Sequence, residues 1–469
     1  MERQNTKNFI TSGNINRVIL TIATPLMINN LIRTLYNLTD GLYVAQLSAE
    51  DFAATAFIWP LNFLFISIGL GISVGATALI AQYFGANDLK LAKKYTWNTM
   101  ALTFTFGFLL STIGYIFAGQ FVEWMGASGV FYEKSTAYLK INFIGLFFDF
   151  AYFGYQALLN AQGRTRVITV VSTISSITNV LLDPIFIFAT IPFTQIPGLN
   201  AGIEGAAWAT VISQMVSALL LFAYIPKFRS VKFQWEDFIP HMKQVEAIAA
   251  LGLTSFIFQI SALIVQIVSN NLLKTYGAMS IYGSEIPIAV GGIVSKVFVI
   301  FIALIIGMTQ GVQPIVGYNY GAKHYLRVRQ TIFLALKIGF VLSFVTWAVF
   351  EIFPLQIIEL FGNGNDLYFE FGIRYMRYFM LFTLINGITI LITTFFPAIG
   401  KAKTGAFLSL ARQLLILLPV MLLMTYIFGV EGMMFATPVS DVISLVLCLF
   451  FFKRELHDIH MKEELILSK

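Results

Sequence analysis

Apolar runs of about 20 residues or more recur along the whole chain, and short polar breaks separate them. A helix of that length crosses a hydrocarbon core about 30 Å thick, and it keeps its backbone groups hydrogen-bonded within itself. Only 12% of the 469 residues are charged, whereas a soluble domain carries about 25%. The sequence therefore predicts an all-α polytopic membrane protein embedded in the lipid bilayer.

We expect twelve transmembrane spans, and the charges between them indicate their orientation. Basic residues gather in the connections after even-numbered spans, such as Lys90, Lys93 and Lys94, whereas the other connections carry mostly acids. Short basic connections stay in the cytoplasm. We therefore expect a multi-pass protein of the cell membrane with both termini in the cytoplasm. The spans have the approximate bounds 17–46, 52–83, 95–118, 136–160, 167–192, 203–225, 246–273, 287–317, 330–351, 372–395, 405–427 and 431–452.

The chain also contains an internal repeat. Three segments of the first half match three of the second in the same order, which indicates duplication. The matched pairs are 69–86 with 305–322, 160–166 with 397–403, and 202–210 with 429–437.

Each half would hold six spans, an even number, so both halves enter the membrane from the same side. This predicts two parallel six-helix bundles, related by a pseudo-twofold axis along the membrane normal and enclosing a central cavity. We expect an N-terminal lobe over residues 1–225, a cytoplasmic linker over 226–246 and a C-terminal lobe with its tail over 247–469.

The first span carries a polar stripe. Asn30, Arg33, Asn37 and Asp40 are spaced by three or four residues and so share one helix face, and Tyr36 flanks them. Arg33 and Asp40 could form structural ion pairs, including one with each other. Because an intramembrane carboxylate is functional by default, we favour a cation or proton site at Asp40.

Span five offers a partner for Asp40. Asn179 and Asp183 are four residues apart and face the same way, and Pro184 frees a backbone carbonyl beside the carboxylate. The alternative is a proline kink with an incidental acid. Two carboxylates and an amide suit a small hard cation, to which Thr210 of span six could add a hydroxyl. Two neighbouring buried carboxylates could equally hold a proton and titrate as a unit.

Other polar residues within spans are candidates for the substrate cavity. Asp149 of span four could line the cavity or pair with Arg33. Lys296 of span eight is a second-half candidate, while some of the other second-half charges are expected to neutralise one another. Pro25 of span one could form a hinge or a simple kink, and Pro184 is a second hinge candidate. The predicted cavity residues are Arg33, Tyr36, Asn37, Asp149, Gln156, Asn160, Lys296 and Gln310.

Several function classes find no support in the sequence. The chain has no G-x-x-x-x-G-K-[ST] loop for ATP and only one cysteine, Cys448. Its four histidines lie in cytoplasmic connections or the tail. We therefore expect no enzyme activity, no cofactor, no nucleic-acid partner and no metal other than a sodium ion at the coupling site. The glycine pairs Gly71/Gly75 and Gly307/Gly311 are typical of close helix packing.

These motifs resemble the multidrug and toxic compound extrusion family, particularly its prokaryotic DNA-damage-inducible branch. The segments that carry the resemblance are TLYNLTDGLYVAQL, the NVLLDP of span five and MTQGVQPIVGYNYGA of span eight. The resemblance implies export of cationic amphipathic compounds in exchange for sodium ions or protons. It also implies a coupling site at Asp40, Asn179 and Asp183, with Thr210 as a further member.

We therefore expect an antiporter that acts as a monomer on amphipathic small molecules. An incoming cation and a cationic substrate would compete for the same carboxylates, and this competition would couple their movements. The main alternative is a flippase or exporter of lipid-linked saccharides of the same superfamily. Such a carrier would use basic cavity residues, for which Arg33, Lys296 and Arg412 are candidates.

Overall fold

A computed structural model describes residues 8–192, 194–224, 239–361 and 364–467, which are almost entirely helical. Within these ranges the extended structure is one isolated bridge between Thr190 and Pro197. The part of the predicted linker at 226–238 lies outside the described residues.

Six long helices make up the first half of the chain. Each begins close to a predicted span, because the apolar runs and their polar breaks determine where a helix can start and end. The helices are α2 Ile15–Ala45, α3 Ala49–Gly85, α4 Leu89–Trp124, α5 Gly129–Ala161, α6 Thr165–Ile187 and α7 Gly202–Tyr224.

The second half has the same order of passes with more interruptions. Two passes are broken: α13 and α14 meet at a bend of 41°, and a π-helical segment, η2, lies between α15 and α16. The elements are α9 Met242–Ala278, α10 Glu285–Gly321, α11 Tyr325–Ile352, α12 Pro354–Phe361, α13 Asp366–Met380, α14 Thr383–Ala398, α15 Ala402–Leu410, η2 Ala411–Leu417, α16 Leu418–Phe428, η3 Gly429–Glu431 and α17 Gly432–Leu467.

Nine helical stretches within the described ranges are long and apolar enough to cross a membrane, or ten if the bent pair counts as one span. One stretch, Ala402–Ile466, has 65 residues, or roughly 100 Å of helix, enough for two passes. The chain reverses in it at Gly429, whose φ of +64° suits glycine, and α16 packs against α17. The helix α5, which carries Lys140 and Asp149, is a further pass. With the bent pair counted as one span and Ala402–Ile466 as two, the helices make up the twelve predicted spans.

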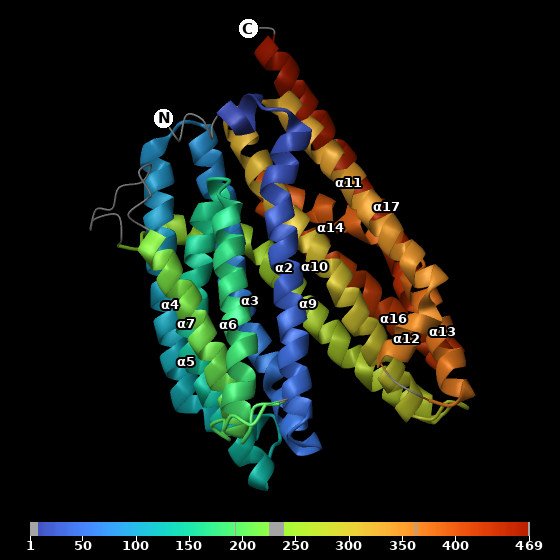
Figure 1. The fold of residues 1–469 in the computed structure, drawn as a ribbon. Coiled ribbons are helices and arrows are strands. Elements are labelled where there is room, and N and C mark those ends of the chain that lie inside the picture. The colour runs from blue at the N-terminus through green and yellow to red at the C-terminus, as the bar shows by residue number, and fades with distance from the viewer. Residues whose placement is uncertain (1–7, 193, 225–238, 362–363, 468–469) are drawn as a thin grey trace. The chain divides into compact units, whose positions relative to one another are not determined.

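Contacts divide the chain into two compact units. One contains Ile28–Gly252, and the other contains Phe9–Met27 and Leu253–Lys469. In the first unit α5 packs against α3, α4 and α7, and α6 packs against α7 (Figure 1). In the second, α14 packs against α10, α11 and α17. Both α2 and α9 therefore contribute residues to both units.

The predicted glycine pairs lie where helices approach one another closely. A side chain at Gly307 or Gly311 of α10 would collide with the backbone of Met27 or Ala23 of α2. In the other unit, a side chain at Gly75 of α3 would meet the α9 backbone at 248–252. The packing role predicted for these glycines is thus confirmed. It explains why the start of α2 groups with second-half helices and the start of α9 with first-half helices.

Candidate functional site

Three residues of the first unit form a hydrogen-bonded cluster on α6 and α7. The Nδ2 atom of Asn179 donates to Oδ1 of Asp183 and to Oγ1 of Thr210, each at 3.3 Å. The four-residue spacing places Asn179 and Asp183 on one helix face, and both are completely buried. Pro184 follows directly within α6. The structure therefore brings together three of the four residues expected at the coupling site.

Asp40, the fourth, lies near the end of α2 and within electrostatic range of Asp183. Its side chain is partly exposed, but its Oδ1 atom is buried. Asp40 Oδ1, Asp183 Oδ2 and Asn179 Oδ1 are all buried and have no hydrogen-bond donor among the described residues. A buried acceptor without a donor costs about 1–3 kcal/mol. A proton or a small hard cation would satisfy these oxygens, so the donor set fits either coupling ion.

Tyr138 of α5 belongs to this cluster and was not predicted. It is buried and interacts electrostatically with Asp40, Asp183 and Tyr36. A phenol beside two carboxylates can donate a hydrogen bond to either of them. The one available signal was the eleven-residue spacing between Tyr138 and Asp149, which is about three helical turns and places both on one side of α5.

Arg33 lies in the same unit but does not neutralise Asp40. Its guanidinium lies 5.9 Å from the ring centroid of Tyr152 and 6.0 Å from that of Phe153. It also interacts with Tyr36 and Asp149. Asp40 is not among the partners of Arg33 in the described part of the chain, so the structure argues against an ion pair between them.

Asp149 has a second, closer partner, which the sequence interpretation also missed. The Nε2 atom of Gln214 on α7 donates to Oδ2 of Asp149 at 2.8 Å. Asp149 is therefore held between an amide on α7 and the more distant charge of Arg33 on α2. Nothing in the local sequence around position 214 distinguishes this glutamine from other polar residues within spans.

The remaining predicted cavity residues differ in burial and location. Asn37 is exposed, whereas Gln156 and Asn160 are buried on α5. Lys296 and Gln310 lie on α10 in the other unit, where Lys296 is exposed and Gln310 partly buried. Pro25 lies inside α2, in the part that groups with that second unit.

A separate polar cluster lies inside the second unit. Arg412 of η2 places Nη2 3.8 Å from Oδ1 of Asp441 on α17. Asn386 of α14 donates from Nδ2 to Asp441 Oδ2 at 3.4 Å and accepts a hydrogen bond from Arg412. All three side chains are buried. The expectation that some second-half charges neutralise each other is confirmed here, and Arg412 is thereby removed from the basic cavity residues.

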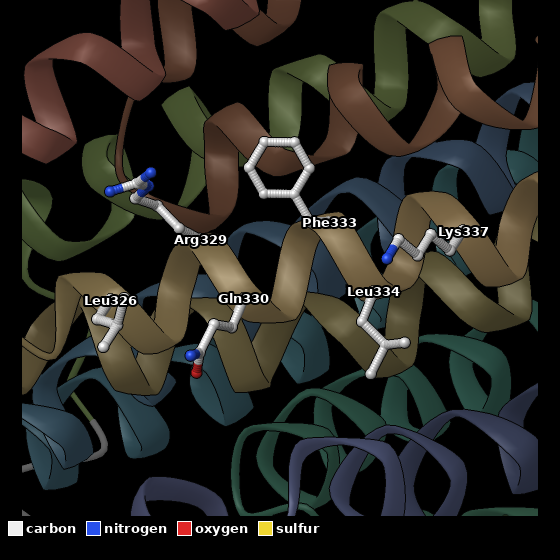
Figure 2. Close-up of a pocket in the computed structure, with 6 residues that line it drawn as sticks. All are labelled: Leu326, Arg329, Gln330, Phe333, Leu334 and Lys337. Carbon is white, nitrogen blue, oxygen red and sulfur yellow. The ribbon is translucent and has the colours of Figure 1, made fainter.

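The surface hollow in Figure 2 has a volume of about 300 Å³ and is lined by residues of α11 alone. Its basic residues are Arg329 and Lys337. Arg329 forms an ion pair with Glu463 at 3.2 Å, and Lys337 lies on a helix with an apolar exposed face, where a long side chain can extend toward the headgroups. We assign no transport role to this hollow. Its lining residues are Leu326, Arg329, Gln330, Phe333, Leu334 and Lys337.

Comparison with known proteins gives consistent matches over nearly the whole chain. A family model described as MatE matches residues 25–185 and 260–423. The FAD transporter of Shewanella oneidensis is 25% identical over 454 residues, which are 95% of this chain and 96% of that protein. The multidrug export protein MepA of Staphylococcus haemolyticus is 24% identical over 448 residues, 94% of each chain.

The fold is also found among solved structures. An outward-facing multidrug resistance MATE family transporter of the MOP superfamily aligns with a TM-score of 0.89, covering 96% of this chain and 98% of that chain. The two sequences are 22% identical over this alignment. At that identity the likeness establishes the fold.

Proposed function

Because this chain belongs to the MatE family, whose members are transporters and not enzymes, we propose that it is a secondary active exporter of amphipathic compounds, mainly cationic, driven by exchange for sodium ions or protons. The observation that carries the proposal is the group of buried oxygens without donors on Asp40, Asn179 and Asp183. Two carboxylates whose charges no arginine or lysine of the described residues cancels form a site that a mobile cation can occupy.

The mechanism follows from the charge of this cluster. When no ion is bound, Asp40 and Asp183 attract a cationic substrate into the first-half bundle. An incoming sodium ion or proton then neutralises the same carboxylates and lowers the affinity for the substrate. A membrane potential of 100 mV adds about 2.3 kcal/mol for each charge moved. Competition for two acids is therefore sufficient to couple efflux to an ion gradient.

The polar residues beside the acids have supporting roles in this proposal. Asn179 holds Asp183 and Thr210 in one hydrogen-bonded group, which keeps the oxygens close enough to share one ion. The hydroxyl of Tyr138 can donate a hydrogen bond to a carboxylate when that carboxylate is charged and accept one when it is protonated. We also place both termini in the cytoplasm, in agreement with the basic connections.

A second candidate function is export of anionic amphipathic compounds, including the lipid-linked saccharides considered above. It is favoured by Arg33, a partly exposed cation on the polar stripe of α2. The similar protein named as an FAD transporter also points to an anionic cargo. Competition between ethidium and flavin nucleotides in one transport assay would distinguish the two charge classes.

The proposal is tested with purified protein in proteoliposomes. Sodium and proton gradients are imposed separately, and efflux of ethidium is followed by fluorescence. We expect one of the gradients to drive efflux and Asp40→Asn to abolish it. Asp88→Asn is the matched control, because Asp88 only caps α4 through Leu91 N and asparagine caps equally well. Undiminished gradient-driven efflux by Asp40→Asn would overturn the proposal.

A further inference from the structure

The internal repeat relates the polar layer around Asp149 to a layer in the second half. Asn386 stands 237 positions after Asp149, the same interval that separates Gly400 from Gly163 in the matched segments. Both residues lie on the fourth pass of their half, Asp149 on α5 and Asn386 on α14. They are therefore equivalent positions of the duplicated fold.

Their hydrogen-bond partners are equivalent as well. Asp441 stands 227 positions after Gln214, the interval between Gly202 and Gly429. The neighbouring serines support this register, because Ser213 and Ser440 each donate to the carbonyl three residues before them at 2.8 Å. Both halves thus place one hydrogen-bonding pair at equivalent positions of their fourth and sixth passes.

The two pairs exchange their chemical groups. In the first half the carboxylate is on α5 and the amide of Gln214 donates to it at 2.8 Å. In the second half the amide of Asn386 is on α14 and donates to the carboxylate of Asp441 on α17 at 3.4 Å. Each half therefore retains one amide and one carboxylate in this layer, although the residues have changed.

The halves differ in what neutralises the carboxylates. In the second half Arg412 lies 3.8 Å from Asp441 and also donates to Asn386. Arg412, Asp441 and Asn386 are 8%, 4% and 2% exposed, so one buried positive charge is matched to one buried negative charge. In the first half Arg33 lies over aromatic rings and interacts electrostatically with Asp149, whereas Asp40 and Asp183 have no arginine or lysine partner among the described residues.

The backbone that carries Arg412 is also unusual. Residues 411–417 form a π-helix, a rare conformation that often marks functional positions. Its wider turn starts one residue before Arg412, at the level where the guanidinium meets α14 and α17. Among the described residues, the buried Cys448 of α17 is a further titratable group near Arg412; it interacts electrostatically with Arg412 and contacts Thr393.

We infer that Arg412 is a tethered counter-ion that keeps the second half's amide–carboxylate pair from binding a mobile cation, and so confines ion coupling to the first half. The guanidinium supplies to Asp441 the charge that a mobile cation would supply to Asp40 and Asp183. This inference rests on the proposed function for what the first half does. Its own prediction is that Asp441 becomes a cation-binding group when Arg412 is replaced by an apolar residue.

The test compares two variants of the full-length purified protein. Arg412→Met removes the charge but retains an unbranched stem, and Arg412→Met/Asp441→Asn removes both charges. Infrared difference spectra are recorded while the pH is stepped between about 5 and 8 and while sodium is added. Beyond the carboxyl signals that Asp40 and Asp183 give in every variant, we expect Arg412→Met to show one further carboxyl signal that responds to proton or sodium. This further signal is absent from both the wild type and the double variant.

Identical spectra in the two variants would overturn the inference. If Arg412→Met does not fold, the double variant still decides, because its buried layer is uncharged and such replacements are often tolerated. We then expect the double variant to transport with the wild-type number of coupling ions per cycle, which the reversal potential measures. A smaller number of coupling ions would overturn the inference. The comparison of spectra does not depend on Asp40, so failure of the proposed function is detected separately by Asp40→Asn.

Discussion

The two halves of this transporter keep acids inside the membrane in different ways. In the first half, Asp40 and Asp183 each have a buried carboxylate oxygen with no donor among the described residues. The second half holds Asp441 against Arg412 and Asn386. A buried acid supplied with its own arginine has no need of a mobile ion. The comparison teaches that the function of a carboxylate inside the bilayer depends on whether its counter-charge is tethered or mobile.

The largest expected effect comes from removing an acid of the first half. Asp183→Asn retains the shape of the side chain and its contact with Asn179 but removes one of the two charges that an incoming cation would compensate. We expect gradient-driven efflux to fall about 100-fold, near the upper end of typical coupling energies, with normal expression and folding. Ethidium efflux from proteoliposomes measures this, and a loss of less than threefold would contradict it.

The next effect, on stability, concerns the second half. Arg412→Met leaves Asp441 buried without its counter-charge, which typically costs about 3–5 kcal/mol. The double variant Arg412→Met/Asp441→Asn is expected to recover most of that loss, because both charges are gone. Unfolding of the purified variants in detergent measures the two values. Equal destabilisation of the single and double variants would show that the ion pair does not account for the burial of these residues.

A smaller effect is expected from the hydrogen-bonded frame of the first-half site. Thr210→Val replaces the hydroxyl that accepts from Asn179 with a methyl group of similar size. We expect about a tenfold increase in the ion concentration needed for half-maximal efflux, equivalent to about 1.4 kcal/mol, with little change in maximal rate. Thr437→Val, at the equivalent position of the second half, is the matched control. An equal shift in that control would remove the distinction between the halves.

The smallest effect is expected at the membrane surface. Lys134 forms ion pairs with Asp51 at 2.8 Å and Glu50 at 3.5 Å, outside the buried clusters. Exposed ion pairs contribute little and are screened by salt. Lys134→Met should leave both efflux and the dependence on the coupling ion at wild-type levels. A change in ion dependence would mean that charges far from Asp40 also determine coupling.

Most of the fold and part of the site could be predicted from the sequence. Apolar length indicated the spans, and matched segments indicated the duplication, because both are properties of the chain read in order. The spacing of Asn179 and Asp183 placed them together, since residues four apart are neighbours on a helix. These predictions needed no knowledge of how the helices pack.

The contacts between helices could not be predicted in the same way. Tyr138 of α5 interacts electrostatically with Asp40 and Asp183, and Gln214 reaches Asp149 from α7. Which sides of two helices meet depends on their rotation and crossing angle, which helical periodicity within one segment does not specify. The pairing of Arg412 with Asp441 likewise depends on the packing of η2 against α17.

Cation binding to the purified protein tests the central claim most directly. Proton release and uptake of radioactive sodium are measured for the wild type, for Asp40→Asn/Asp183→Asn and for Arg412→Met/Asp441→Asn. We predict that the wild type binds its coupling ion saturably, that the first-half double variant loses this binding, and that the second-half double variant retains it. Binding that survives removal of Asp40 and Asp183 but disappears with Arg412 and Asp441 would contradict the account.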